Sequence, residues 1–88
     1  MGLDTVETIL WAEQEFGIEI PDADASSIRT VGEFSSYIHK RLLSINAHTL
    51  HSESKVLESI KAYLVTHVGV RPELIIRKAE FVKDLGLD

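Results

Sequence analysis

The apolar residues of this chain recur at three- and four-residue steps in three long stretches, and this spacing restricts the fold more than any other feature. Such steps place apolar side chains along one side of an α-helix, whereas a strand needs alternation, and no useful alternating pattern occurs. The first stretch ends at Gly17, the second begins at a capping-box pattern from Thr30 to Glu33, and the third ends at Gly69. The sequence therefore predicts an all-α bundle.

The expected bundle has three long helices and one or two short ones in a single domain over residues 1–88. The first long helix covers residues 3–16, and a weaker short helix over 22–27 follows Pro21. The second long helix begins at Val31, and the third begins near Ser54. Residues 44–53 have no apolar periodicity, so we interpret them as a polar connector. Pro72 is placed to open a last short helical segment.

The acidic residues are concentrated at one end of the chain. The net charge is −5, which argues against a nucleic-acid partner because affinity for nucleic acid comes from neutralising phosphates with Lys and Arg. Residues 1–24 contain no Lys or Arg, so a basic partner is a natural expectation. The acids of this segment are Asp4, Glu7, Glu13, Glu15, Glu19, Asp22 and Asp24.

Several classes of function are disfavoured by what the sequence lacks. The absence of cysteine excludes disulfides, thiolate metal sites and a cysteine nucleophile. His48 and His51 form only a His-x-x-His pair in the connector, which is weak support for a metal site, so we predict none. No catalytic constellation is indicated, and we expect no enzyme activity. Neither a signal peptide nor a membrane span is visible, which makes a cytoplasmic location the default and argues against a membrane partner.

Two blocks of the sequence resemble one protein family in reversed order. The block from Leu3-Asp4-Thr5-Val6-Glu7 through Gly17-Ile18-Glu19-Ile20-Pro21-Asp22 and Ile28-Arg29-Thr30-Val31-Gly32 resembles the second half of an acyl carrier protein. The block over 56–88, with Ala79-x-Phe81-Val82-x-Asp84-Leu85-Gly86-x-Asp88, resembles the first half. Residues 1–43 thus match the second half and residues 54–88 the first. The resemblance implies the family's four-helix bundle in circularly permuted form, with residues 44–53 joining the original termini.

The resemblance also implies a missing prosthetic group. In this family the serine of an Asp-Ser-Leu motif carries the 4′-phosphopantetheine arm. Asp88 matches the Asp and Leu3 matches the Leu, but Gly2 stands at the serine position and has no hydroxyl. We therefore expect no phosphopantetheine attachment and no other cofactor.

The first helix is the candidate partner-binding element, because the resemblance implies that its acidic face meets a basic patch on an enzyme of fatty-acid or polyketide type. A solvated face kept for solubility is the alternative. Trp11 could anchor such an interface or pack half-buried against a neighbouring helix. The candidate partner-binding residues are Leu3, Asp4, Val6, Glu7, Leu10, Glu13 and Gln14.

The resemblance further implies an apolar interior able to hold an acyl chain, although ordinary core packing would explain the same residues.

The main hypothesis is a non-enzymatic binding module without its own phosphopantetheine arm. The alternatives are a working acyl carrier with an unconventional or in-trans pantetheine group, and a lipid-sequestering structural module. A monomer is favoured over a domain-swapped dimer, since the connector is long enough to close the bundle within one chain. The possible pocket-lining residues are Val6, Phe34, Ile38, Ile60, Tyr63 and Val68.

Overall fold

The computed structural model describes residues 3–87 and confirms the all-α prediction. Within these residues the only strand-like pairing is an isolated antiparallel bridge between Thr30 and Glu80. A single turn of π-helix and a turn of 3₁₀-helix complete the helical content. The elements are α1 (Leu3–Phe16), α2 (Asp22–Ser27), α3 (Val31–Ile45), α4 (Glu53–Tyr63), the π-helix η1 (Leu64–Val68) and the 3₁₀-helix η2 (Pro72–Leu74).

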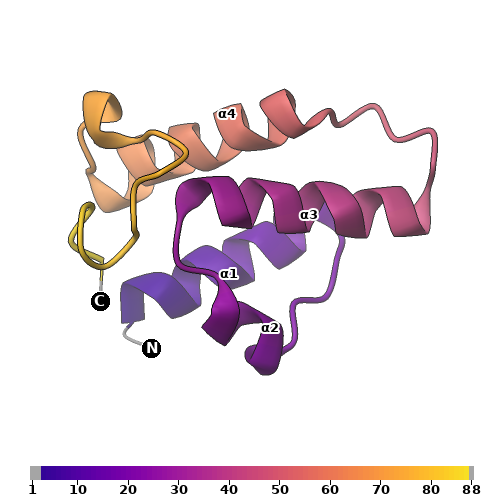
Figure 1. Ribbon diagram of the computed structural model, residues 1–88, viewed down its shortest axis with the longest axis horizontal. Coiled ribbons are helices and arrows are strands. Elements are labelled where there is room, and N and C mark those ends of the chain that lie inside the picture. The colour runs from indigo at the N-terminus through magenta and orange to yellow at the C-terminus, as the bar shows by residue number, and fades with distance from the viewer. Residues whose placement is uncertain (1–2, 88) are drawn as a thin grey trace.

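Helix α3 lies between α4 on one side and α1 on the other (Figure 1). Helices α3 and α4 run antiparallel, joined by the connector, and α2 lies beside α1 at the opposite edge of the molecule. The segment after η2 has no long helix. It folds back over the end of the bundle where α1 and α3 begin, so the two chain ends lie on the same side of the molecule (Figure 1).

The predicted helix boundaries with a local chemical signal are confirmed. Gly17 ends α1 in the left-handed conformation with φ 65°, which glycine adopts at little cost. The Thr30 Oγ1 atom accepts a hydrogen bond from the Glu33 N–H at 3.1 Å, and the Glu33 carboxylate accepts one from the Thr30 N–H at 3.0 Å. Backbone N–H donors from Arg29 and Thr30 hold the pKa of Glu33 below its usual value.

The predicted connector is too long at both ends. Helix α3 continues to Ile45, and α4 begins at Glu53, so the connector is confined to residues 46–52. The earlier start of α4 has a clear cause, because Ser52 is its N-cap. The Ser52 hydroxyl accepts a hydrogen bond from the Lys55 N–H at 3.2 Å. The third predicted helix also changes character at residue 64, where it becomes the π-helical turn that ends at Gly69.

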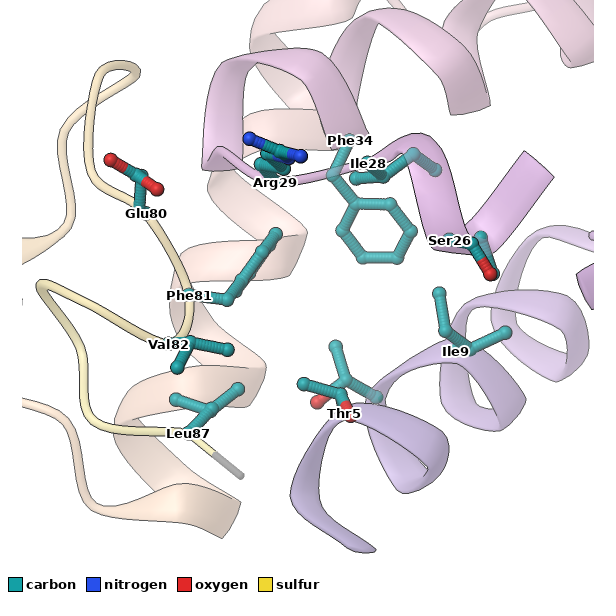
Figure 2. Close-up of a pocket in the computed structure, with 12 residues that line it drawn as sticks. Thr5, Ile9, Ser26, Ile28, Arg29, Phe34, Glu80, Phe81, Val82 and Leu87 are labelled. Atoms are coloured by element: carbon teal, nitrogen blue, oxygen red, sulfur yellow. The ribbon is translucent and has the colours of Figure 1, made fainter. Parts of the chain in front are cut away.

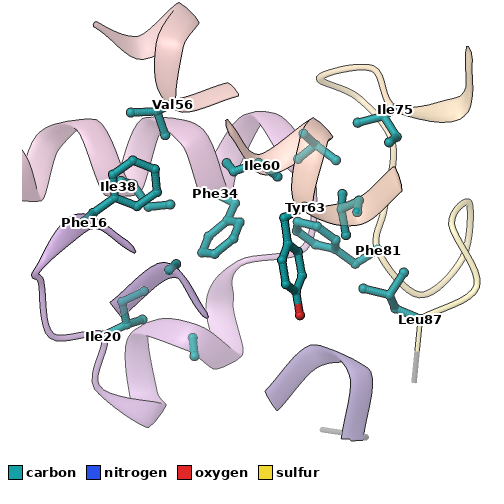
Figure 3. Close-up of a cluster of buried hydrophobic side chains, with 14 of the residues drawn as sticks. Phe16, Ile20, Phe34, Ile38, Val56, Ile60, Tyr63, Ile75, Phe81 and Leu87 are labelled. Carbon is teal, nitrogen blue, oxygen red and sulfur yellow. The ribbon is translucent and has the colours of Figure 1, made fainter. Parts of the chain in front are cut away.

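The core is formed mainly between α3 and α4 and is closed by the C-terminal segment (Figure 3). Phe34 and Ile38 of α3 face Ile60 of α4 in this interior, and all three are almost completely buried. Phe34 also packs edge-to-face against Phe81, with ring centroids 5.7 Å apart. Because Leu87 is likewise buried, the segment over 80–87 is an integral wall of the domain.

A turn around Arg77 fastens this segment to the start of α3. The Gly32 N–H donates a hydrogen bond to the Arg77 carbonyl at 2.8 Å, so the two backbones are in direct contact. The Arg77 guanidinium forms an ion pair with Glu53 at 2.7 Å and donates to the Ser36 hydroxyl at 3.2 Å. One arginine therefore links the C-terminal segment to α3 and α4. None of the helices over residues 3–87 is long and apolar enough to cross a membrane.

Candidate functional site

The outer face of α1 combines exposed apolar and acidic side chains. Val6 is 37% exposed and Leu10 is 51% exposed, and Glu7 and Gln14 beside them are also exposed. Their positions follow from helical geometry, because the opposite side of α1 packs into the core at Ala12. These four residues, Val6, Glu7, Leu10 and Gln14, are called the α1 outer face below.

Two of the predicted partner-binding acids are less exposed than these residues. Asp4 is half-buried, and its carbonyl accepts a hydrogen bond from the Thr8 hydroxyl at 2.8 Å. Glu13 is half-buried, and its carboxylate accepts a hydrogen bond from the Ile20 N–H at 2.8 Å. Glu13 therefore orders the loop that follows α1. The side chain of Leu3, also predicted to bind a partner, lies outside what the structure describes.

Trp11 packs half-buried against α4, the second of the two arrangements considered from the sequence. Its ring stacks on Tyr63 with centroids 4.5 Å apart and meets Phe16 edge-on at 5.8 Å. Tyr63 also stacks on His67, with centroids 5.1 Å apart. The three stacked rings join α1 to α4 and its π-helical end, so Trp11 has a clear packing role.

Glu7 and Glu15 are the exposed acids of α1. Within residues 3–87 the ion pairs join other elements, and none involves an acid of α1. In α2 the Asp24 carboxylate instead accepts a hydrogen bond from the Tyr37 hydroxyl at 2.7 Å. Burial and this hydrogen bond raise the pKa of Tyr37 to about 12.

A cavity of about 340 Å³ lies between α1, α2, the start of α3 and the C-terminal segment (Figure 2). Its lining is mainly apolar, and its polar residues include the buried Thr8 as well as the charged Arg29 and Glu80. The volume is at the lower end of the range for small-molecule sites, which is about 300–1,000 Å³. The lining residues are Thr5, Thr8, Ile9, Ala25, Ser26, Ile28, Arg29, Phe34, Glu80, Phe81, Val82 and Leu87.

The residues that line this cavity differ from the predicted pocket-lining residues, and Phe34 alone is common to both sets. Val6 belongs to the α1 outer face. Ile38 and Ile60 are fully buried in the filled interface between α3 and α4, and Tyr63 belongs to the aromatic stack. Val68 is half-buried in η1. The cavity forms where α1 meets residues 80–87, a contact between segments far apart in the sequence that helical periodicity does not reveal.

Over residues 3–87, no group of three or more His, Asp or Glu side chains is arranged to hold a metal ion. His51 packs edge-on against Phe16, with centroids 5.6 Å apart. Gly2 and Asp88, the two ends of the expected attachment motif, lie outside the described residues.

No protein-family model and no solved structure matches the chain.

Proposed function

We propose that this protein is a non-enzymatic binding module of acyl-carrier type, without its own phosphopantetheine arm, that docks on the basic surface of a fatty-acid or polyketide-type enzyme. The observation that carries the proposal is the α1 outer face, on which exposed Val6 and Leu10 adjoin the exposed carboxylate of Glu7. The resemblance of the sequence to acyl carrier proteins supplies the class of partner.

The chemistry of the α1 outer face suits a charged docking surface. Exposed Val6 and Leu10 can be covered by a partner at a small entropic cost, because short aliphatic side chains have few rotamers to lose. The Glu7 carboxylate beside them increases the rate of encounter with a cationic surface, and this increase falls as salt screens the charge. The net charge of −5 acts in the same direction.

The docking test measures binding to a purified ketosynthase of fatty-acid synthesis by surface plasmon resonance over a range of salt concentrations. The Glu7→Lys variant should weaken binding by about tenfold and flatten its salt dependence, since a rim charge acts mainly on association. Glu58→Lys is the matched control, because Glu58 is also an exposed glutamate and lies on α4. Equal losses for the two variants would contradict docking through α1.

The missing arm has its own test. Incubation with coenzyme A and a promiscuous phosphopantetheinyl transferase should leave the intact mass unchanged, since the serines of this chain lie outside any Asp-Ser-Leu motif. A mass gain of one phosphopantetheine would instead support a working carrier with an unconventional attachment site.

The cavity favours a second candidate, a lipid-sequestering module. An apolar cavity of about 340 Å³ is larger than the engineered cavity of about 150 Å³ that holds benzene. Amide shifts at Ile9, Phe34 and Phe81 on titration with a short-chain amphiphile would support this candidate. If those amides stay unchanged at millimolar ligand, sequestration is excluded and the docking proposal remains open to its own test.

A further inference from the structure

We infer that the cavity selects a short-chain amphiphile with a neutral polar head, such as a primary alcohol, over chains that end in a carboxylate or an ammonium group. The inference rests on the second candidate function, because it names the ligand class of that cavity. It also assigns head-group discrimination to Arg29 and Glu80.

The interior of the cavity defines the chain portion of the ligand. Ile9, Ile28, Phe34, Phe81 and Leu87 supply an aliphatic and aromatic lining with no charged group among them. Phe34, Phe81 and Leu87 are buried, so this part of the wall is fixed by core packing. Burial of a hydrocarbon chain here would contribute about 25 cal/mol for each Å² of apolar surface removed from water.

The charged residues of the lining stand together at one end. Figure 2 shows Arg29 and Glu80 toward the same end of the cavity. Their backbones are held in register, because the Phe81 N–H donates a hydrogen bond to the Arg29 carbonyl at 3.0 Å and Thr30 bridges to Glu80. The backbones of one positive and one negative residue of the lining are thus held side by side at this end.

The charges at this end of the cavity disfavour both kinds of ionic head group. A carboxylate beside Arg29 also meets Glu80, the acid of the cavity lining. An ammonium group beside Glu80 meets Arg29. Either ion loses hydration at the cavity mouth with incomplete compensation, which is costly for a charged group. A hydroxyl can donate to Glu80 and accept from Arg29, so it is compatible with both charges.

The test compares octanol, octanoate and octylammonium as ligands by ¹H–¹⁵N NMR titration of the whole chain. Octanol should bind about tenfold more tightly than either ion, with the largest shifts at Ile9, Phe34 and Phe81. Tighter binding of octanoate or octylammonium would overturn the inference while leaving sequestration intact. Binding of none of the three would overturn both.

Two charge-removing variants separate head-group discrimination from a structural effect. Glu80→Gln should strengthen octanoate binding by about threefold, and Arg29→Gln should strengthen octylammonium binding by a similar factor, with octanol little changed in both. A purely structural role would shift all three ligands together, and that result would refute the assignment of Arg29 and Glu80.

The location of the ligand is tested by occlusion. Ser26 is an exposed rim residue, so Ser26→Trp should lower octanol affinity about tenfold. Ser54→Trp, at an exposed serine of α4 away from the cavity, should leave it unchanged. Unchanged binding in Ser26→Trp, with the far-UV circular dichroism spectrum preserved, would place the ligand elsewhere and overturn the inference.

Discussion

Replacement of Gly32 by alanine tests how the C-terminal segment is held. A Cβ atom at this position would lie 2.9 Å from the Arg77 carbonyl oxygen and 3.1 Å from the Arg77 Cβ. The nearest atom belongs to the backbone, and the Gly32 N–H already donates to that carbonyl at 2.8 Å. The turn at Arg77 must therefore move, which weakens this hydrogen bond together with the Arg77–Glu53 ion pair.

The magnitude follows from two opposing contributions. Overpacking at a close contact costs about 1–3 kcal/mol. Replacing glycine by alanine in a helix interior gains at most about 1 kcal/mol, and Gly32 lies in the first turn, where the gain is smaller. We expect a net loss of about 1–2 kcal/mol in the free energy of unfolding. For a domain of this size each kcal/mol lowers Tm by about 4–8 °C.

The assay is urea denaturation followed by far-UV circular dichroism, with a thermal melt in parallel. Ser54→Ala is the control, because Ser54 is an exposed helical residue where alanine gains propensity without meeting another element. That variant should be as stable as the parent or slightly more stable. A Gly32→Ala protein with unchanged or increased stability would show that the close approach of Arg77 is not a packing constraint.

Three further substitutions probe single hydrogen bonds. Thr30→Ala removes the N-cap of α3 and should cost about 1 kcal/mol by urea denaturation, whereas Thr30→Ser should restore most of it. Glu13→Ala leaves the Ile20 N–H without its acceptor and should cost about 1–3 kcal/mol, with a smaller loss for Glu13→Gln. The pKa of Tyr37 is raised from 10.0 to about 12, so its contribution to stability is complete below pH 10 and is lost as the pH rises through about 12. Tyr37→Phe should flatten that alkaline decline in stability, as measured by denaturation across this pH range.

The outcomes that contradict these expectations are equally specific. Equal losses of stability in Thr30→Ala and Thr30→Ser would show that the N-cap hydrogen bond is not the cause of the loss. Full stability of Glu13→Ala would mean that water replaces the carboxylate at the Ile20 N–H. An alkaline decline that persists unchanged in Tyr37→Phe would have to come from another group.

The sequence predicted those parts of the fold that are encoded locally. The capping box at Thr30 and the left-handed end of α1 at Gly17 each depend on a few neighbouring residues, so a single sequence reveals them. The start of the connector was harder to predict from the sequence. Ser44 and Ile45 are exposed, so their helical conformation depends on continuation of α3 and not on an apolar face.

The candidate site was only partly predictable for a different reason. Exposure of Val6 and Leu10 was left open by the periodic pattern, since either residue could have belonged to the edge of the core stripe. The role of Glu13 depends on the path of the loop after α1, which brings the Ile20 N–H to its carboxylate. The cavity depends on residues 80–87 folding back over α1, and no local pattern specifies that return.

The two candidate functions use different sides of one helix, which makes them separable. Successive residues of an α-helix are rotated by about 100°, so Ile9 lines the cavity while its neighbour Leu10 is exposed on the outer face. Substitution of Leu10 by serine should reduce partner binding without changing octanol affinity, because it removes apolar contact area outside the cavity. Ile9→Ala should change octanol affinity and leave the α1 outer face intact. Each variant is expected to affect only one kind of binding. Loss of both partner binding and octanol binding in both variants would therefore indicate unfolding of α1 and not loss of either site.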